Sequence, residues 1–422
     1  MRIRRMSPWQ LYRRVRDSGV SGIAQRLAWE AYRRFDGASV DFVLREQDIA
    51  DSRRLRLVQP TSPVASGQIA RVGWVCTPPG PGSGGHTTLF RMVAGLESLG
   101  TQCTLFLYDP RGGDVERHRA TIRTHWPHML ADVRDATAGI TGVDAAIASS
   151  WETAHVLASH SDGPLARLYF VQDYEPFFYP HGATSALAED TYRFGFRTIA
   201  LGHMVASHIA ELGVDVDVAP FGCDTDVYSL SNTGARAGVV CYAKPGNHRR
   251  GYLLAKLALT AFHRRHPEQE IHVYGEQVRG WDIPITQHGK LAPAELNDLY
   301  NRSIGGLALS FTNISLVAEE MLAAGTIPIV NDSPDSRADL PNEHVEWALP
   351  TVGGIADALS RVVEGGHPDR SARAAGSVRR GWGPAQGVVA AAVSAAVSGS
   401  ESPARGASSG LGRVDDEIPH LE

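Results

Sequence analysis

Short apolar runs alternate with amphipathic segments along residues 70–222. The runs have the length and character of strands that are buried on both faces, and they are "ARVGWVC" (70–76), "CTLFLYD" (103–109), "VDAAIASS" (143–150), "RLYFVQD" (167–173), "RTIALG" (197–202) and "VDVAPFG" (216–222). Between the first two, residues 87–100 place large apolar side chains on one helical face, and Gly100 stands where a glycine often ends a helix. This alternation predicts a parallel sheet covered by helices on both faces.

The same alternation restarts after a polar, turn-rich segment at residues 226–238. Further strand-like runs are "VVCYAK" (239–244), "EIHVYGE" (270–276), "GGLALS" (305–310) and "IPIVN" (327–331), and helical segments cover 251–267, 292–303, 315–325 and 355–365. The pattern predicts an α/β chain with two Rossmann-like, doubly wound domains facing each other across a cleft. Ligands of such sheets bind at the carboxyl ends of the strands.

These patterns set the expected domain boundaries. We predict a basic helical extension and connector at 1–68, a first domain at 69–230, a second domain at 231–376, a crossover helix that returns to the first domain at 377–396, and a disordered tail rich in Ser, Gly and Pro at 397–422.

Charge is unevenly distributed along the 422 residues. The net charge is −5, but residues 1–36 hold nine arginines against three acidic residues, interleaved with aromatic side chains. Such a helix either lies on an anionic membrane surface or packs against the protein with a solvated arginine face. No apolar run is long enough to span a bilayer, there is no signal-peptide pattern, and the four cysteines are widely spaced. We expect a cytoplasmic protein, with residues 1–36 as the candidate contact with the inner face of the plasma membrane. Basic clusters are too sparse for nucleic-acid binding.

A glycine-rich loop separates the first predicted strand from the first predicted helix. Gly80, Gly82 and Gly85 satisfy G-x-G-x-x-G, and Asp109 ends the next strand, which is the arrangement of a dinucleotide-binding fingerprint. Three prolines at 78, 79 and 81 lengthen and stiffen the loop, whereas that fingerprint needs a tight turn. Alternatively, the loop lets the backbone approach an anion at a helix N-terminus. A plain surface turn is the third interpretation.

The second half of the chain resembles the nucleotide-sugar domain of GT-B glycosyltransferases, especially family 4. The resemblance lies in "SFTNISLVAEEMLAAGTIPIVND" (310–332), where Glu320, Gly325 and Pro328 match the family's helix and following strand, and in "FGCDTDVY" (221–228) at the domain boundary. More narrowly, "FVQDYEPFFYPHG" (170–182) and the K-P-x-x-x-R-R segment (244–250) are similar to WsaF-type rhamnosyltransferases. The resemblance implies transfer of a hexose, here L-rhamnose from a dTDP-L-rhamnose donor, to a saccharide or lipid-linked glycan in bacterial polysaccharide assembly. It also implies a retaining reaction without metal or cofactor.

The resemblance and the chemistry of glycosyl transfer together suggest roles for the candidate residues of the second domain. A departing diphosphate needs cations and backbone dipoles. We expect Lys244, Arg249 and Arg250 to contact the diphosphate, and the backbone amides of Asn313, Ile314 and Ser315 to hold it or the sugar. A solvated basic turn is the alternative for the three cations. By analogy with the family, Glu320 accepts hydrogen bonds from the ribose. Thr312 stands where the family has its first Glu, which leaves its catalytic role open.

We expect the first domain to supply the acceptor side of the site. Gly84, Gly85 and His86 would face donor and acceptor across the cleft. Asp173 and Glu175, interleaved with aromatic residues, would contact the acceptor, with Asp173 as a candidate base; a strand-end loop over a buried aromatic cluster is the alternative. Two D-x-D sequences, at 215–217 and 224–226, are interpreted as structural. A nicotinamide-dependent oxidoreductase and a non-catalytic sugar-binding protein are the alternative functions.

Overall fold

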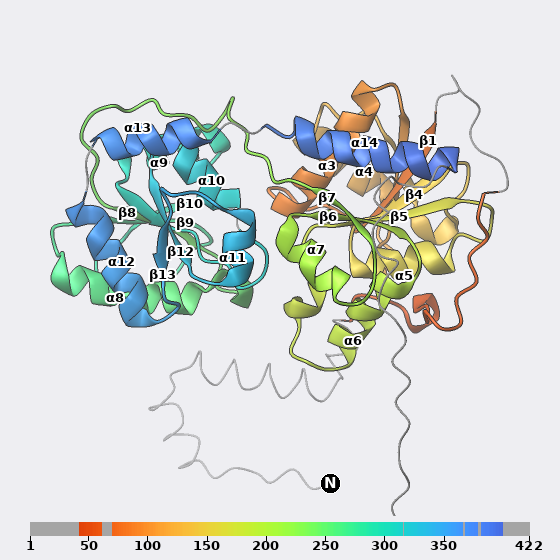
Figure 1. Cartoon of the computed structure of the whole chain (residues 1–422), viewed down its shortest axis with the longest axis horizontal. Helices are drawn as coiled ribbons and strands as arrows, with labels where there is room; N and C mark the ends of the chain where they lie inside the picture. The colour runs from red at the N-terminus through yellow and green to blue at the C-terminus, as the bar shows by residue number, and fades with distance from the viewer. Residues whose placement is uncertain (1–41, 61–69, 315, 366–367, 379–380, 400–422) are drawn as a thin grey trace, which may run out of the picture. The chain divides into compact units, whose positions relative to one another are not determined.

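The computed structural model of the chain describes residues 42–60, 70–314, 316–365, 368–378 and 381–399. The chain divides into a compact unit of residues 1–49, in which the 3-10 helix η1 (Glu46–Asp48) is described, and a second unit of residues 50–422. Most of the predicted basic extension and of the predicted tail lie outside the described residues. The second unit contains two parallel sheets (Figure 1). We call each sheet together with its helices a lobe: the N-terminal lobe and the C-terminal lobe.

The N-terminal lobe is built on a seven-stranded parallel sheet with the order β3-β2-β1-β4-β5-β6-β7. Its strands are β1 (Arg71–Cys76), β2 (Gln102–Leu107), β3 (Asp132–Asp135), β4 (Ala145–Ala148), β5 (Ala166–Val171), β6 (Arg197–Leu201) and β7 (Val216–Ala219). Val72 of β1 is paired with Cys103 on one side and with Ala145 on the other. β4 and β5 are buried along their whole length, as the apolar runs predict for strands covered on both faces.

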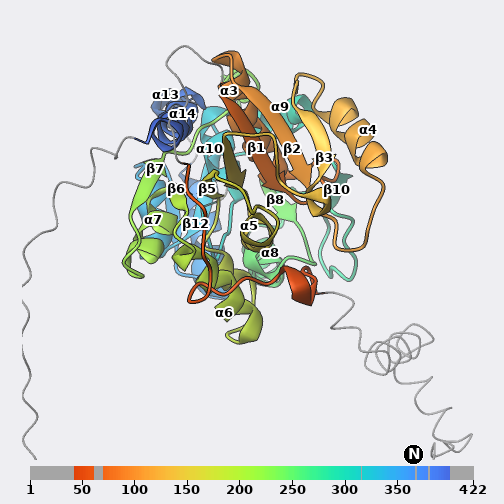
Figure 2. The ribbon, with the colours of Figure 1, turned by 90° about the vertical axis from the view of Figure 1, so that its right-hand side faces the viewer.

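Helices cover both faces of this sheet. They are α3 (Gly84–Ser98), α4 (Val115–His125), α5 (Trp151–Ser159), α6 (Ala183–Asp190), α7 (His203–Ala210) and α14 (Gly383–Ser398), with 3-10 helices η2 (Ala136–Ala138), η3 (Glu175–Phe178) and η4 (Thr191–Arg193). α3 and α14 lie on one face, and α5 and α7 on the other (Figures 1 and 2). α14 contacts α3 and strands β4 to β7, so the last described helix of the chain completes the core of the N-terminal lobe.

The C-terminal lobe contains a six-stranded parallel sheet with the order β10-β9-β8-β11-β12-β13. Its strands are β8 (Val239–Ala243), β9 (Ile271–Gly275), β10 (Thr286–Gly289), β11 (Gly305–Leu307), β12 (Ile327–Asn331) and β13 (Glu346–Ala348). Its helices are η5 (His248–Arg250), α8 (Tyr252–Arg265), α9 (Pro293–Arg302), α10 (Leu316–Ala323), α11 (Pro334–Asp339), α12 (Val352–Glu364) and α13 (Pro368–Ser377). α8 and α12 cover one face and α9 and α10 the other (Figure 1). Two Rossmann-like sheets therefore confirm the predicted α/β fold class.

The strand order reverses in the middle of both sheets. In the N-terminal lobe the reversal lies between β1 and β4, and in the C-terminal lobe it lies between β8 and β11. At such a point the chain leaves two neighbouring strands in opposite directions, and a crevice opens at their carboxyl ends. The loops that follow β1, β4, β8 and β11 are therefore the places where the fold favours a ligand site.

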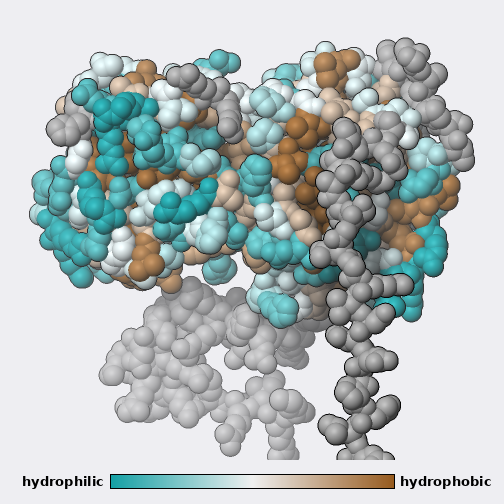
Figure 3. All heavy atoms as spheres, in the orientation of Figure 1, coloured by the Kyte–Doolittle hydropathy of each residue, from teal (hydrophilic) through white to brown (hydrophobic). Residues whose placement is uncertain are grey.

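The hydrophobic residues are concentrated in the cores of the two lobes. In the N-terminal lobe Trp74 packs edge to face on Phe170, with ring centroids 6.3 Å apart. On the face drawn in Figure 3, hydrophilic side chains are spread over both lobes and hydrophobic ones form small groups. Within the residues described, no helix combines the length and the apolar content needed to cross a membrane.

Candidate functional site

A tight turn after β8 places the basic residues of the C-terminal lobe. Asn247 accepts a hydrogen bond from the backbone N–H of Arg249 at 3.2 Å, which starts η5. Gly251 then takes the left-handed conformation (φ 61°), and a Cβ there would lie 2.8 Å from the ring of Phe311. The carbonyl of Arg249 accepts from the N–H of Phe311 at 2.9 Å. Through these contacts the turn lies against the end of β11. The side chain of Lys244, at the start of the turn, makes no hydrogen bond or ion pair with the part of the chain that is described.

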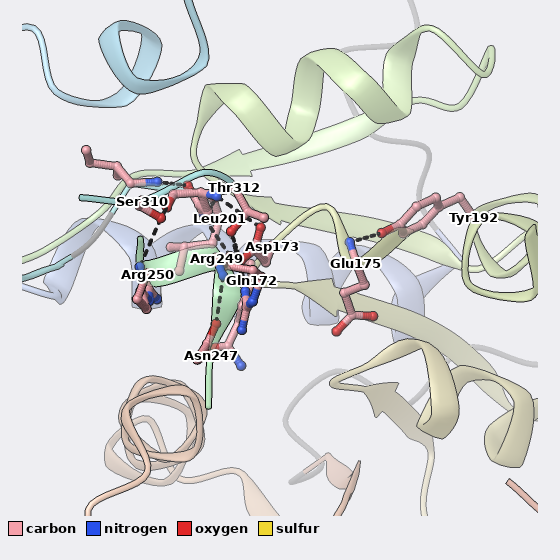
Figure 4. Close-up of polar contacts among 12 residues, drawn as sticks. Gln172, Asp173, Glu175, Tyr192, Leu201, Asn247, Arg249, Arg250, Ser310 and Thr312 are labelled. Atoms are coloured by element: carbon pink, nitrogen blue, oxygen red, sulfur yellow. Dashed lines mark hydrogen bonds and ion pairs between the residues drawn. The ribbon is translucent and has the colours of Figure 1, made fainter. Parts of the chain in front are cut away.

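Three buried residues, Asp173, Thr312 and Asn313, and the half-buried Arg249 form a polar group that we call the Asp173 cluster. Arg249 Nη1 donates to Asp173 Oδ2 at 2.6 Å, and Thr312 Oγ1 donates to the same oxygen at 2.8 Å (Figure 4). The backbone N–H of Asn313 donates to Asp173 Oδ1 at 3.1 Å. Asp173 is only 8% exposed. Burial raises the pKa of its carboxyl, and the charge of Arg249 counteracts that shift.

Contacts from the N-terminal lobe hold this cluster on two further sides. The guanidinium carbon of Arg249 lies 3.7 Å from the centroid of the Phe178 ring, a cation–π contact. The side-chain amide of Asn313 donates to the carbonyls of Gln172 and, at 3.5 Å, of Leu201, which lie at the ends of β5 and β6. The loop after β11 is thus fixed to the carboxyl ends of two strands of the first sheet.

Arg250 points into the C-terminal lobe instead. Its Nη1 donates to Ser310 Oγ at 3.0 Å, and the backbone N–H of Ser310 donates to Asn331 Oδ1 at 2.8 Å. Arg250 lines a small pocket of about 10 Å³, with room for about one water molecule, whose other walls are Cys241, Tyr242, Ala255, Leu307, Ala308, Leu309 and Val317. Burial lowers the pKa of Arg250, and the charge of Asp173 opposes that effect. The pocket lies where the strand order reverses between β8 and β11.

The glycine loop ends beside the same region. Gly84 and Gly85 open α3, and Gly82 takes a positive φ of 76°. A Cβ on Gly85 would lie 4.0 Å from the side-chain oxygen of Gln172, the residue before Asp173. A methyl group at Gly85 would therefore make only an ordinary contact with the end of β5.

His86 is bound by its own loop. Its Nε2 lies 2.9 Å from the carbonyl oxygen of Thr77, and its Nδ1 lies 2.8 Å from Ser83 Oγ. Because a carbonyl only accepts hydrogen bonds, Nε2 carries the proton, and Nδ1 of the neutral ring accepts from Ser83. Burial lowers the pKa of His86, which favours that neutral form. Both ring nitrogens thus hold the loop in shape.

Glu175 lies apart from the Asp173 cluster. Its carboxylate accepts hydrogen bonds from the backbone N–H of Trp151 and, at 2.7 Å, from the hydroxyl of Tyr169. Figure 4 shows it beside Tyr192 and away from Arg249. Burial raises the pKa of this carboxyl well above its usual range. Its contacts are those of a buried acid within the aromatic cluster, which the sequence left open as the alternative.

Glu320 lies in α10 near the junction of the two lobes. The charges of Arg91 of α3 and of Asp224 act on its carboxyl group, and these two residues form an ion pair with each other. The guanidinium of Arg91 also lies 4.8 Å from the ring centroid of Trp382. Burial raises the pKa of Glu320 to about 7. The amide of Ile314 is taken by Asn313 Oδ1 at 2.8 Å, and Ser315 lies outside the described residues.

Two other carboxylates that the sequence singled out have partners within the N-terminal lobe. Asp109, the acidic residue of the dinucleotide alternative, accepts from the N–H of Arg111 at 2.9 Å and lies 3.3 Å from His118 Nε2. Asp217 pairs with Arg197 at 2.7 Å.

The structure therefore gathers five of the predicted residues into one region: Asp173, Arg249, Arg250, Thr312 and Asn313, with Gly85 adjoining them through Gln172. Sequence reasoning missed Ser310, which orients Arg250, and the contact of Phe178 with Arg249. Ser310 ends a predicted strand and Phe178 lies in the quoted aromatic segment, but nothing in their local spacing indicates these partners.

Two domain models of known proteins match the segments that contribute to this region. The WsaF N-terminal domain model matches residues 128–204, which include Asp173, and the WsaF C-terminal domain model matches residues 237–360, which include Arg249 and Thr312. The chain is 31% identical over 326 residues to the O-antigen biosynthesis protein RfbC of Myxococcus xanthus. That match covers 72% of this chain and 25% of RfbC, so the chain spans about a quarter of that protein's length.

Solved structures agree on the fold. The Anabaena protein HepE (Alr3699), in complex with UDP and glucose, is 13% identical with a TM-score of 0.56, over 78% of this chain and 97% of that one. WaaG, a glycosyltransferase involved in lipopolysaccharide biosynthesis, is 12% identical with a TM-score of 0.51, over 75% of this chain and 98% of WaaG. Identities this low support the fold alone. The expected GT-B fold and the resemblance to WsaF-type proteins are confirmed.

Proposed function

We propose that this chain, matched in its two lobes by the WsaF domain models, is a glycosyltransferase. It takes a sugar from a nucleoside-diphosphate donor held at the ends of β8 and β11, and passes it to a saccharide acceptor held at the ends of the N-terminal strands. The acceptor belongs to a bacterial polysaccharide or a lipid-linked glycan. The similarity to an O-antigen biosynthesis protein supports this setting.

One observation carries the proposal: two arginines and a pocket meet where the strand order of the C-terminal sheet reverses. Arg250 lines the pocket, and Arg249, the preceding residue, and the amide of Asn313 both donate to Asp173 at the end of β5. When the glycosidic bond to the diphosphate breaks, positive charge grows on the anomeric carbon and negative charge on the leaving diphosphate. Fixed cations and amide dipoles in a water-poor site stabilise that leaving charge. Arginine suits it because its planar fork matches a phosphate with two hydrogen bonds.

Lys244 adds a third cation at the start of the same turn. In this proposal Lys244, Arg249 and Arg250 meet the charge of the diphosphate without a metal ion, and Glu320 binds the ribose from α10. The Gly84–Gly85 backbone and His86, with the end of β5, face the acceptor. The proposal has two further parts: the reaction retains the configuration of the anomeric carbon, and the transferred sugar is L-rhamnose from dTDP-L-rhamnose. They rest on the similarity of residues 170–182 and 244–250 to WsaF-type rhamnosyltransferases.

A ligand panel tests this function on the full chain. Thermal unfolding is followed with dTDP, UDP, GDP, their sugar conjugates and NAD, because a ligand that binds only the folded protein raises its Tm. We expect the largest rise with dTDP or dTDP-L-rhamnose, and release of dTDP when an oligosaccharide acceptor is added. Equal and negligible shifts from all nucleotides would contradict the donor site, and a shift with NAD alone would favour the oxidoreductase alternative. Slow donor hydrolysis without transfer would favour a non-catalytic sugar-binding protein.

A further inference from the structure

Asp173 makes an unusual set of contacts for a carboxylate at a strand end. It receives hydrogen bonds from an arginine side chain, a threonine hydroxyl and a backbone amide, at 2.6, 2.8 and 3.1 Å. All three donors come from the C-terminal lobe, whereas Asp173 follows β5 of the N-terminal lobe. An arginine, a hydroxyl and an amide ahead of a helix are the groups that proteins use to bind phosphate. The carboxylate therefore occupies a set of donors suited to a phosphate.

The three donors are held in place around this carboxylate. Phe178 packs on the guanidinium of Arg249, and the side chain of Asn313 is bonded to the carbonyl of Gln172. A second anion that used Arg249 and the Asn313 amide would have to approach the buried carboxylate within a few ångströms. Like charges at that separation repel strongly in a site with little water. The two anions therefore cannot occupy these donors together.

We propose that the Asp173 carboxylate is an internal competitor of the donor's diphosphate, so that binding of the diphosphate releases Asp173 from Arg249, Thr312 and Asn313. This inference rests on the proposed function, because it takes the same arginine turn as the diphosphate site. The released carboxylate stays at the end of β5, where it faces the acceptor side. The donor therefore binds first, and its binding frees the carboxylate for a sugar hydroxyl.

Competition of this kind has a measurable size. When only a fraction of the molecules has its binding groups free, the apparent Kd is the intrinsic Kd divided by that fraction. If Asp173 holds Arg249 in about nine molecules out of ten, removal of its charge tightens pyrophosphate binding by about tenfold.

The test measures pyrophosphate binding to the full chain by isothermal titration calorimetry at neutral pH. Asp173→Asn keeps the shape of the side chain and removes its charge; Asp173→Ser is the second variant, in case the first does not fold. The matched control is Asp335→Asn, because Asp335 contacts His208 across the lobes at 3.3 Å and does not touch the Asp173 cluster. We expect about tenfold tighter binding in either Asp173 variant and the wild-type Kd in Asp335→Asn.

The outcomes separate this inference from the proposed function. Binding by the Asp173 variants that is equal to or weaker than wild type overturns the competition, while nucleotide binding and sugar transfer by the wild type would leave the proposed function intact. An equal gain in Asp335→Asn also overturns it, because the effect would then come from loosened lobes. Pyrophosphate itself is the probe, so a failure of all four proteins to bind it overturns the inference whether or not a nucleotide sugar is transferred.

Discussion

Thr312 donates its hydroxyl proton to Asp173 at 2.8 Å, although the two residues are 139 positions apart in the chain. The same hydroxyl accepts from Arg249 at 3.4 Å. A threonine fits between the two because a hydroxyl both donates and accepts. A glutamate, which the family 4 pattern has at this position, would place a second carboxylate against Asp173.

We therefore expect Thr312→Glu to destabilise the protein. A second buried carboxylate beside Asp173 leaves negative charge that Arg249 alone does not compensate, at a cost of about 3 kcal/mol or more. Thr312→Ser, which keeps the hydroxyl, should stay within about 1 kcal/mol of wild type. Chemical denaturation at pH 7 measures both. Equal stability of the two variants would contradict the assigned contact.

Arg250→Gln should weaken binding of a nucleoside diphosphate. The variant loses a charged hydrogen-bond donor at the pocket, and such a bond contributes about 1.5–3 kcal/mol, or roughly 10- to 100-fold in Kd. Arg265→Gln is the matched control, because Arg265 lies in α8 and pairs with Asp357 on the surface. Calorimetry with dTDP measures the effect. A wild-type Kd in Arg250→Gln would remove this arginine from the proposed site.

Gly85→Ala separates the fold from the function of the glycine loop. The new methyl meets only ordinary contact with Gln172, and alanine favours a helix more than glycine, so stability should be unchanged or higher by up to about 1 kcal/mol. Sugar transfer should fall about tenfold or more, because the proposed function brings the ligand against this backbone and the methyl would occupy that space. The control is Gly387→Ala in α14, where a Cβ meets no atom within 4 Å and transfer should not change. Normal transfer by Gly85→Ala would mark the loop as a plain surface turn.

The ionisation of Glu320 should lower the stability of the protein as the pH rises from about 4.5 to about 7. Its pKa is about 7 in the folded protein against the usual 4.5, so the folded chain binds this proton more tightly than the unfolded chain. The bound proton makes its full contribution to the free energy of unfolding below pH 4.5, and this contribution is lost as the pH rises through about 7. The loss amounts to about 3 kcal/mol. Glutamine stays uncharged at every pH. The free energy of unfolding of Glu320→Gln should therefore equal that of wild type at pH 4.5 and exceed it by about 3 kcal/mol at pH 8. A gain that is the same at both pH values would contradict the burial of this carboxyl.

The sequence predicts the centres of both sheets and misses part of their edges. The central strands are short apolar runs because helices cover both of their faces; they are β1, β4 and β5 in the first sheet and β8, β11 and β12 in the second. Three strands went unpredicted: β3 (Asp132–Asp135), β10 (Thr286–Gly289) and β13 (Glu346–Ala348), and each lies at the edge of its sheet. An edge strand has a partner on one side and solvent close by, so its side chains carry no continuous apolar pattern.

The sequence predicts those site residues that directly follow a strand or precede a helix, and it does not predict contacts between distant loops. Lys244, Arg249 and Arg250 follow a strand, and residues 312–314 precede a helix, so the fold rule for strand ends indicates both segments. The contact of Asp173 with Arg249 joins residues 76 positions apart and depends on how two loops meet. No periodicity encodes such a contact. From the sequence we therefore predicted that Asp173 contacts the acceptor, whereas in the structure it accepts a hydrogen bond from Arg249.

The return of α14 to the N-terminal lobe has a consequence for how the chain is made. Ala385, Val389 and Ala392 of α14 are buried, and the helix covers β4 to β7. On the ribosome, this face of the first sheet stays uncovered until the whole second lobe has been translated. Strands β8 to β13 lie within residues 239–348 and can close earlier. We expect the lobe that is synthesised first to be the one that finishes folding last, with its exposed apolar face a target for chaperones in the meantime.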